Sequence, residues 1–121
     1  MWQSKWVSDV FSSVTEWLSV PDVADRLGVV PGKVRRMIEE HQLFVVVRDG
    51  VKLIPAHLLV DGEPLPSIPG TISVLIDAGF TLDQAIEWLY VPEESIGRPP
   101  IESLLEGRKS EVRRIAQSLA F

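Results

Sequence analysis

The segment spanning residues 18–38 constrains the fold of this chain more strongly than any other part of the sequence. Within it, Ala24, Gly28 and Val34 are spaced as in two short helices that cross at a steep angle around a tight turn. Such a crossing requires a small side chain on the first helix, which Ala24 supplies. The turn requires a residue that tolerates a positive φ, which Gly28 supplies. The segment therefore predicts two helices packed against each other at a large angle.

The residues on either side of this turn predict where the helices begin and end. Ser19 is a good N-cap for a helix over residues 20–27, and Asp22 suits its first turn. Pro31 begins a second helix that runs to about His41. This second helix buries one face and leaves the other free, and the buried face holds Val34, Met37 and Ile38.

A β-hairpin is expected next, over residues 44–54. Runs rich in β-branched residues flank the dipeptide Asp49-Gly50, and this pattern is a strong hairpin signal. Pro55 and the apolar pair Leu58-Leu59 then predict one short helical turn.

The remaining sequence predicts a linker and a helical C-terminal half. Residues 61–70 hold three prolines and two glycines, which indicates a stiff linker or loop. Thr81 and Gln84 have the spacing of a capping box. We expect four helices in this half, over residues 69–78, 82–90 and 100–105, with a last one capped by Ser110.

The first residues predict one more helix. In an amphipathic helix from Trp6 to Glu16, one face would hold Val7, Val10, Phe11 and Val14. Trp17 and Trp88 are expected in the core. Trp2 and Trp6 are expected either at the surface or in a homodimer contact, because large exposed aromatic side chains often mark interfaces.

Composition excludes several classes of function. The chain has 121 residues and no Cys, so a disulfide scaffold, a thiolate metal site and a Cys nucleophile are excluded. Its apolar runs are far shorter than the ~20 residues of a membrane span, and its first residues lack a signal-peptide pattern. His41 and His57 are not spaced as metal ligands, and the common nucleotide-binding and hydrolase motifs are absent. We expect a cytoplasmic protein with no enzymatic activity, metal, cofactor or membrane partner.

Charge is unevenly distributed along the chain. The formal net charge is −5, which taken alone argues against a nucleic-acid partner. Residues 17–60, however, carry six Lys or Arg against five Asp or Glu, whereas residues 61–121 carry five against ten. A small basic surface in the first half is therefore compatible with the negative net charge of the whole chain.

Residues 18–38 and the hairpin that follows resemble the helix-turn-helix of excisionase-like and MerR-like winged-helix DNA-binding domains. The resemblance implies that residues 17–60 form a three-helix core with a β-hairpin wing. The helix over residues 31–41 would enter the major groove of double-stranded DNA, and the wing over residues 44–54 would lie on the backbone. The candidate DNA-binding residues are Pro31, Gly32, Lys33, Arg35 and Arg36 on the helix, and Arg48 and Lys52 on the wing.

The chemistry of these side chains fits that role. Arginine pairs with guanine edges, lysine neutralises phosphate, and the free N–H groups of a helix N-terminus bind phosphate. Arg35 and Arg36 point about 100° apart on a helix. We expect at least one of them to pair with Glu39 or Glu40 instead of DNA.

Residues 80–117 resemble the toxin-binding domain of Xre/ParS-type antitoxins. The shared elements are Ala85-Ile86 with Trp88-Leu89, Gly97-Arg98 with Pro100-Ile101, Leu104-Leu105 with Gly107, and Glu111-Val112. This resemblance implies that the C-terminal helices bind a protein partner or mediate oligomerisation.

Taken end to end, the chain resembles a family of small actinobacterial winged-helix DNA-binding proteins. The resemblance implies a mostly α fold, in which residues 1–16 precede a winged helix-turn-helix over 17–60 and a packed all-α domain over 66–121. It also implies a regulator of transcription that associates with the nucleoid. The modest basic face predicts either a homodimer or weak binding.

Two further hypotheses accompany this one. The chain could instead be a protein-interaction module in which residues 80–117 bind the partner and the helix-turn-helix is scaffold. DNA binding weakens steeply with salt, whereas a hydrophobic protein interface need not, so salt dependence separates the two. Phosphorylation near the N-terminus would repel DNA if that segment lies beside the recognition helix. The candidate acceptors are Ser4, Ser8, Ser12, Ser13 and Thr15.

Overall fold

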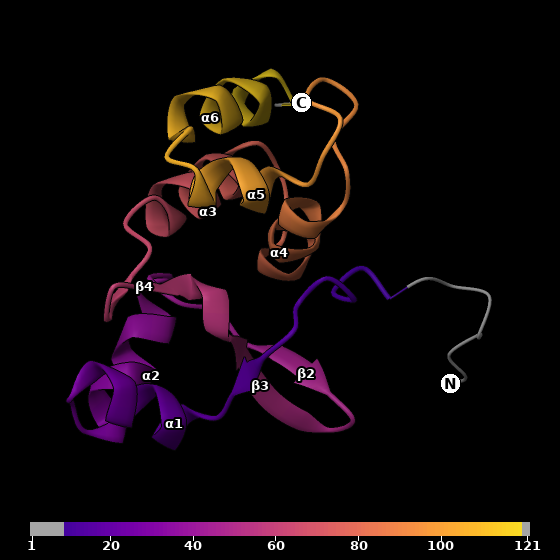
Figure 1. The fold of residues 1–121 in the computed structure, drawn as a ribbon. Helices are drawn as coiled ribbons and strands as arrows, with labels where there is room; N and C mark the ends of the chain where they lie inside the picture. Colours follow the sequence, from indigo (N-terminus) through magenta and orange to yellow (C-terminus); the bar gives the residue numbers. More distant parts are fainter. Residues whose placement is uncertain (1–8, 120–121) are drawn as a thin grey trace.

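The computed structural model describes residues 9–119, and its ribbon has a lower and an upper lobe in the view of Figure 1. The lower lobe contains, in chain order, β1 (Trp17–Leu18), α1 (Val20–Leu27), α2 (Pro31–Glu39), β2 (Val46–Arg48), β3 (Val51–Pro55), the 3-10 helix η1 (Ala56–Leu58), β4 (Leu59–Val60) and β5 (Glu63–Pro64). The upper lobe contains α3 (Ile68–Asp77), α4 (Leu82–Tyr90), α5 (Pro100–Leu105) and α6 (Lys109–Ser118). This order confirms the predicted mostly α fold, a winged helix-turn-helix followed by a helical domain.

The sheet of the lower lobe has the strand order β1-β3-β2, with both pairings antiparallel. The predicted hairpin forms β2 and β3, and the dipeptide Asp49-Gly50 makes its turn with φ values of 51° and 79°. Positive φ at both central residues is the geometry of the two-residue turn that suits the twist of paired strands. β1 pairs Leu18 with Ile54, so the segment just before α1 is held on the base of the hairpin.

Local signals place the two helices of the helix-turn-helix as predicted. The Ser19 side chain accepts a hydrogen bond from the Asp22 N–H, and the Asp22 side chain accepts one from the Ser19 N–H, which completes a capping box. Gly28 ends α1 in the left-handed conformation, with φ of 70°. α2 ends at Glu39 rather than His41, because His41 adopts a φ of 63° and its N–H bonds back to the Ile38 carbonyl.

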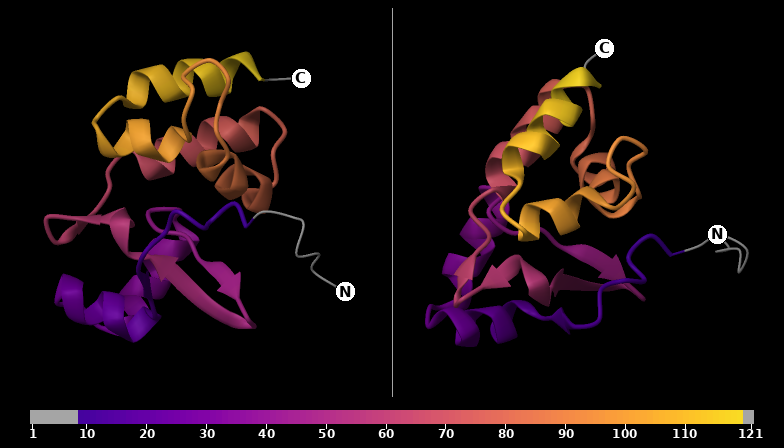
Figure 2. Two further views of the ribbon diagram at one scale, coloured as in Figure 1. Left: turned by 45° about the vertical axis from the view of Figure 1, so that its right-hand side comes forward. Right: turned by 45° about the horizontal axis from the view of Figure 1, so that its top comes forward.

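The four helices of the upper lobe pack on one another through their apolar faces. α3 contacts both α4 and α6, and α5 contacts the same two helices. Both views of Figure 2 show α6 at the top of this lobe. Thr81 and Gln84 form the predicted capping box at the start of α4. The last helix begins at Lys109 with Arg108 at its N-cap, so the expectation that Ser110 caps it is wrong.

One continuous apolar core joins the two lobes. Tyr90, at the end of α4, is 3% exposed and packs against the rings of Phe11 and Phe44 from the lower lobe. Its hydroxyl lies 2.6 Å from Nε2 of His57 in η1. Trp17 and Trp88 are half-buried against the same core.

The predicted helix from Trp6 to Glu16 is wrong over the described part of that range. Residues 10–13 form a turn, and residues 14–16 have no regular secondary structure and lead into β1. The Asp9 carboxylate accepts a hydrogen bond from the Phe11 N–H, and this local bond competes with helix formation. The Glu16 carbonyl accepts a bond from the Ala56 N–H, which draws the chain toward the sheet. Trp2, Trp6, Ser4 and Ser8 lie outside the described residues.

The predicted linker over residues 61–70 is structured. Asp61 and Gly62, with φ of 52° and 77°, make a second tight turn between β4 and β5. α3 then begins at Ile68, inside the range expected to be a loop. Within residues 9–119, no helix combines the length and apolar character needed to cross a membrane.

Candidate nucleic-acid interface

α2 presents a basic face to solvent. Val34 and Met37 are buried at 0% and 8% exposure and hold the helix on the core. Lys33, Arg35 and Arg36, which alternate with them, are all exposed. None of the three forms an ion pair with another residue in the range 9–119, so neither Arg35 nor Arg36 has the expected glutamate partner. The three cations are therefore free to meet an anionic surface.

The N-terminus of α2 adds one backbone donor to this face, the N–H of Gly32, because Pro31 has no N–H and the Lys33 N–H bonds to the Val30 carbonyl. Val30 is the N-cap, and it provides no side-chain hydrogen bond to the first turn. Pro31 and Gly32 follow and are exposed. Because the first turn of a helix has N–H groups without helical partners, this end carries partial positive charge and can accept a phosphate.

The wing places its two basic residues on opposite faces. The register pairs Val47 with Lys52 and Arg48 with Val51. Directly opposed residues share a face of a hairpin, and successive residues alternate. Lys52 and Val47 therefore lie on one face, where both are exposed. Arg48 lies on the other, so the two wing candidates are not brought together.

Arg48 is held by two partners that the sequence did not reveal. Its Nη1 and Nη2 atoms donate to the two carboxylate oxygens of Asp9, with Nη1 2.9 Å from Oδ1. The guanidinium also lies 4.9 Å from the centre of the Trp17 ring, a cation–π contact. Hydrogen bonding from Arg48 lowers the pKa of Asp9, while the same bond raises the pKa of Arg48. Asp9 precedes the helix-turn-helix, and no local signal links it to the wing.

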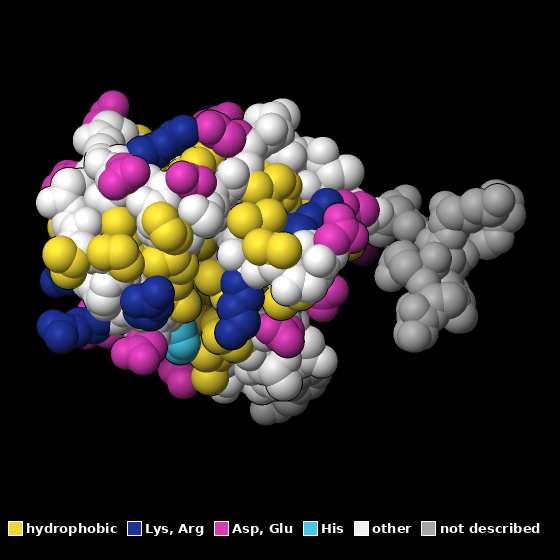
Figure 3. Space-filling view, turned by 90° about the horizontal axis from the view of Figure 1, so that it is seen from below, with side chains coloured by type: hydrophobic (Ala, Val, Ile, Leu, Met, Phe, Trp, Pro, Cys, Tyr) yellow, Lys and Arg dark blue, Asp and Glu magenta, His cyan; other side chains and the backbone are white. Residues whose placement is uncertain are grey.

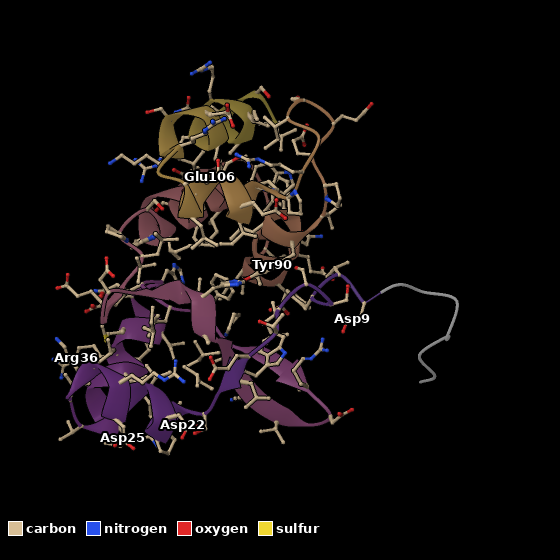
Figure 4. The ribbon with its side chains drawn as sticks, in the orientation of Figure 1. Asp9, Asp22, Asp25, Arg36, Tyr90 and Glu106 are labelled. Atoms are coloured by element: carbon tan, nitrogen blue, oxygen red, sulfur yellow. The ribbon has the colours of Figure 1, made fainter. Side chains whose placement is uncertain are left out.

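Acidic residues border the basic face and limit its extent. Figure 4 shows Asp22 and Asp25 along the lower edge of α1, whereas Arg36 lies at the side of the lobe on α2. Glu39 and Glu40 are exposed at the far end of α2. Seen from below, Lys and Arg side chains form separate groups with hydrophobic and acidic side chains between them (Figure 3). The basic surface is therefore small.

The described residues hold no group of three or more His, Asp or Glu side chains arranged to bind a metal ion. His57, one of the two histidines, is instead half-buried against Tyr90. Burial lowers the pKa of His57 and raises that of Tyr90. This pair belongs to the contact between the lobes and lies apart from the basic face of α2.

Comparison with known proteins gives matches along almost the whole chain. Residues 6–59 match the family model of the DNA-binding protein Rv2175c winged helix-turn-helix domain, and residues 65–120 match that of the Rv2175c C-terminal domain of unknown function. The DNA-binding protein Rv2175c of Mycobacterium tuberculosis (strain ATCC 25618 / H37Rv) is 29% identical, over 93% of this chain and 86% of the relative. The NMR structure of Rv2175c superposes with a TM-score of 0.81 at 28% identity, covering 94% of this chain and 87% of that chain.

Proposed function

The chain belongs to the Rv2175c family, in which a winged helix-turn-helix domain precedes a C-terminal domain of unknown function, and on this premise we propose that it binds double-stranded DNA. The observation that carries the proposal is the set of three exposed cations on α2, free of ion pairs to other described residues. A helix so placed in a helix-turn-helix enters the major groove with its N-terminal residues first.

The proposed mode of binding assigns different contacts to the side chains of α2. Arg35 and Arg36 point in directions about 100° apart, so one reaches a guanine edge while the other meets a phosphate. Lys33 neutralises backbone charge, and the open N-terminus at Pro31 and Gly32 receives a phosphate. These contacts fix the register of α2 on the duplex.

The wing contributes through Lys52, which is exposed beside Val47. Arg48 contributes less while it is bound to Asp9, because the pair is close to neutral and its geometry is fixed. The proposed DNA-binding domain spans residues 17–60, and the proposed second domain spans residues 66–121. We propose transcriptional regulation at the nucleoid as the role, by DNA binding without catalysis.

A second candidate function is binding of a protein by the C-terminal helices. The observation that favours it is a groove lined by Phe80, Trp88 and Val91, with Gln84 and Glu87 among its polar residues. Val91 is 43% exposed, which is high for a large apolar side chain. This function does not exclude DNA binding by the first lobe, and the resemblance of residues 80–117 to an antitoxin domain stays a prediction.

Fluorescence anisotropy of a labelled duplex from the promoter region of the protein's own gene tests the proposed function. With about six phosphate contacts, the logarithm of the binding constant falls with the logarithm of salt concentration with a slope of about −5. Analytical ultracentrifugation of the complex shows whether one or two copies bind. A folded protein that does not bind this duplex or unrelated duplexes at low salt would contradict the proposal.

A further inference from the structure

The most exposed large hydrophobic side chains lie on the two elements that the proposed function uses. Within residues 9–119, three such side chains are more than half exposed: Val30 at 69%, Val47 at 62% and Val51 at 53%. Val30 is at the start of α2, and the other two are on the wing. Val47 and Val51 lie on opposite faces of the wing, so the three side chains form no single patch, and each is considered by its own place in the proposed interface.

Val30 stands where a polar residue would stabilise the helix better. Ser, Thr, Asp and Asn are strongly preferred as N-caps because their side chains accept a hydrogen bond from the first turn. Ser19 does so for α1, the other helix of the pair. Val30 has the extended backbone of an N-cap, with φ of −78° and ψ of 153°, but offers two methyl groups and no acceptor. Departures from local preference are expected at functional sites.

The side chains next to Val30 leave its methyl groups unobstructed. Pro31 and Gly32 are exposed and carry no charge or side-chain hydrogen-bond donor, and Lys33 is the first charged residue of the helix. The leading end of α2 is therefore apolar at the side-chain level, with phosphate-binding groups on the backbone and on Lys33. It is suited to an apolar feature on a base edge.

In the major groove, thymine is distinguished by its C5-methyl group, which apolar side chains contact. We propose that Val30 contacts a thymine C5-methyl group and makes the chain prefer a thymine under the start of α2. This proposal rests on the proposed function and adds a specificity-determining residue to it. It requires that α2 enters the groove with its N-terminus leading.

The test compares the promoter duplex with an otherwise identical duplex in which deoxyuridine replaces every thymidine. The exchange removes the C5-methyl groups and keeps the base pairing. Loss of one buried methyl contact corresponds to about a fourfold weaker binding constant. The native chain is expected to bind the uridine duplex about fourfold more weakly. The Val30→Ala variant keeps one shorter methyl group and is expected to show a clearly smaller preference for the thymidine duplex.

Val60→Ala is the matched control, because Val60 is also an exposed valine, at 39%, but lies on β4 outside α2 and the wing. It is expected to keep the full preference for thymidine. Equal binding of the two duplexes by the native chain would overturn the role of Val30. A preference for the thymidine duplex that is unchanged in the Val30→Ala variant would also overturn the role of Val30. Failure of the native chain to bind any duplex at low salt would overturn the proposed function itself, and this inference with it.

Discussion

Asp9 accepts two hydrogen bonds from the guanidinium of Arg48, so the segment ahead of the helix-turn-helix is tied to the wing. The same guanidinium lies over the ring of Trp17 in β1. Three parts of the chain thus meet at one cation: the turn before the first strand, the strand itself and the hairpin. The charge that Arg48 offers to DNA is offset by the carboxylate that positions it.

Replacement of Asp9 by Asn is expected to strengthen DNA binding. The change removes a negative charge next to Arg48 and frees the guanidinium to meet a phosphate. The salt dependence should become steeper by up to about one unit of slope, as expected for one added phosphate contact. Fluorescence anisotropy over a salt series measures both effects.

Glu16→Gln is the control for that variant, because Glu16 pairs with Arg26 of α1 at 2.6 Å and its loss changes the net charge equally. It should alter DNA binding much less, since Arg26 lies outside the proposed interface. Equal effects of the two variants would show that Arg48 makes no contact of its own with DNA.

The contact between His57 and Tyr90 is expected to make stability depend on pH. Burial lowers the pKa of His57 from its ordinary 6.5, so the folded chain resists protonation that the unfolded chain accepts. The free energy of unfolding should therefore fall as pH drops from about 6.5 toward the folded pKa. At pH values well above 6.5, His57 should contribute nothing to the pH dependence. Urea unfolding at a series of pH values measures this slope.

His57→Gln should flatten that slope, because glutamine does not titrate. His41→Gln, at the other histidine of the chain, serves as the control for general effects of removing an imidazole. If the slope below pH 6.5 were the same in the native chain and in His57→Gln, the buried imidazole would not be its source.

Gly28→Ala is expected to destabilise the chain by about 1 kcal/mol, because Gly28 has a φ of 70° and a Cβ is strained there. Gly32→Ala is the matched control, since its Cβ would meet no atom within 4 Å and its φ is not positive. It should be neutral or stabilise by up to about 1 kcal/mol. Urea unfolding at pH 7 compares the free energies of unfolding of the two variants. Equal destabilisation would argue against left-handed strain as the cause.

Tyr90→Ala is expected to cost about 3 kcal/mol and to weaken both lobes together, since its ring packs on Phe11 and Phe44 across the lobe contact. Tyr90→Phe, which removes only the hydroxyl near His57, should cost about 1 kcal/mol. Differential scanning calorimetry of the native chain should give one two-state transition. Two resolved transitions would contradict a single cooperative core.

Much of the fold follows from short-range sequence signals. The N-cap at Ser19, the capping box at Thr81, the left-handed Gly28 and the Asp49-Gly50 turn each act within a few residues, and the sequence predicts each of them. The basic face of α2 was predicted as well, because helical periodicity alone separates Lys33 from Val34. The hairpin at Asp61-Gly62 carries the same Asp-Gly signal as the first, but the prolines around it indicate a linker instead.

What sequence reasoning missed depends on contacts between distant residues. The apolar spacing of Val10, Phe11 and Val14 suggested a helix, but Phe11 packs against Tyr90 and the chain is drawn into β1 instead. The pairing of Asp9 with Arg48 has no local signature either. Arg35 and Arg36 form no ion pair with another described residue, although their spacing to Glu39 and Glu40 predicts one. Spacing alone does not determine where these side chains lie.

The most direct test of the proposed function compares two charge-reversal variants of equal net charge in the same anisotropy titration. The first variant carries Glu in place of three cations of α2: Lys33, Arg35 and Arg36. The second carries Glu in place of three exposed cations at or beside α6 in the upper lobe: Arg108, Lys109 and Arg114. With both variants folded by circular dichroism, we predict that only the first loses DNA binding at low salt. Equal loss in both, or retained binding in the first, would contradict the assignment of α2 as the recognition helix.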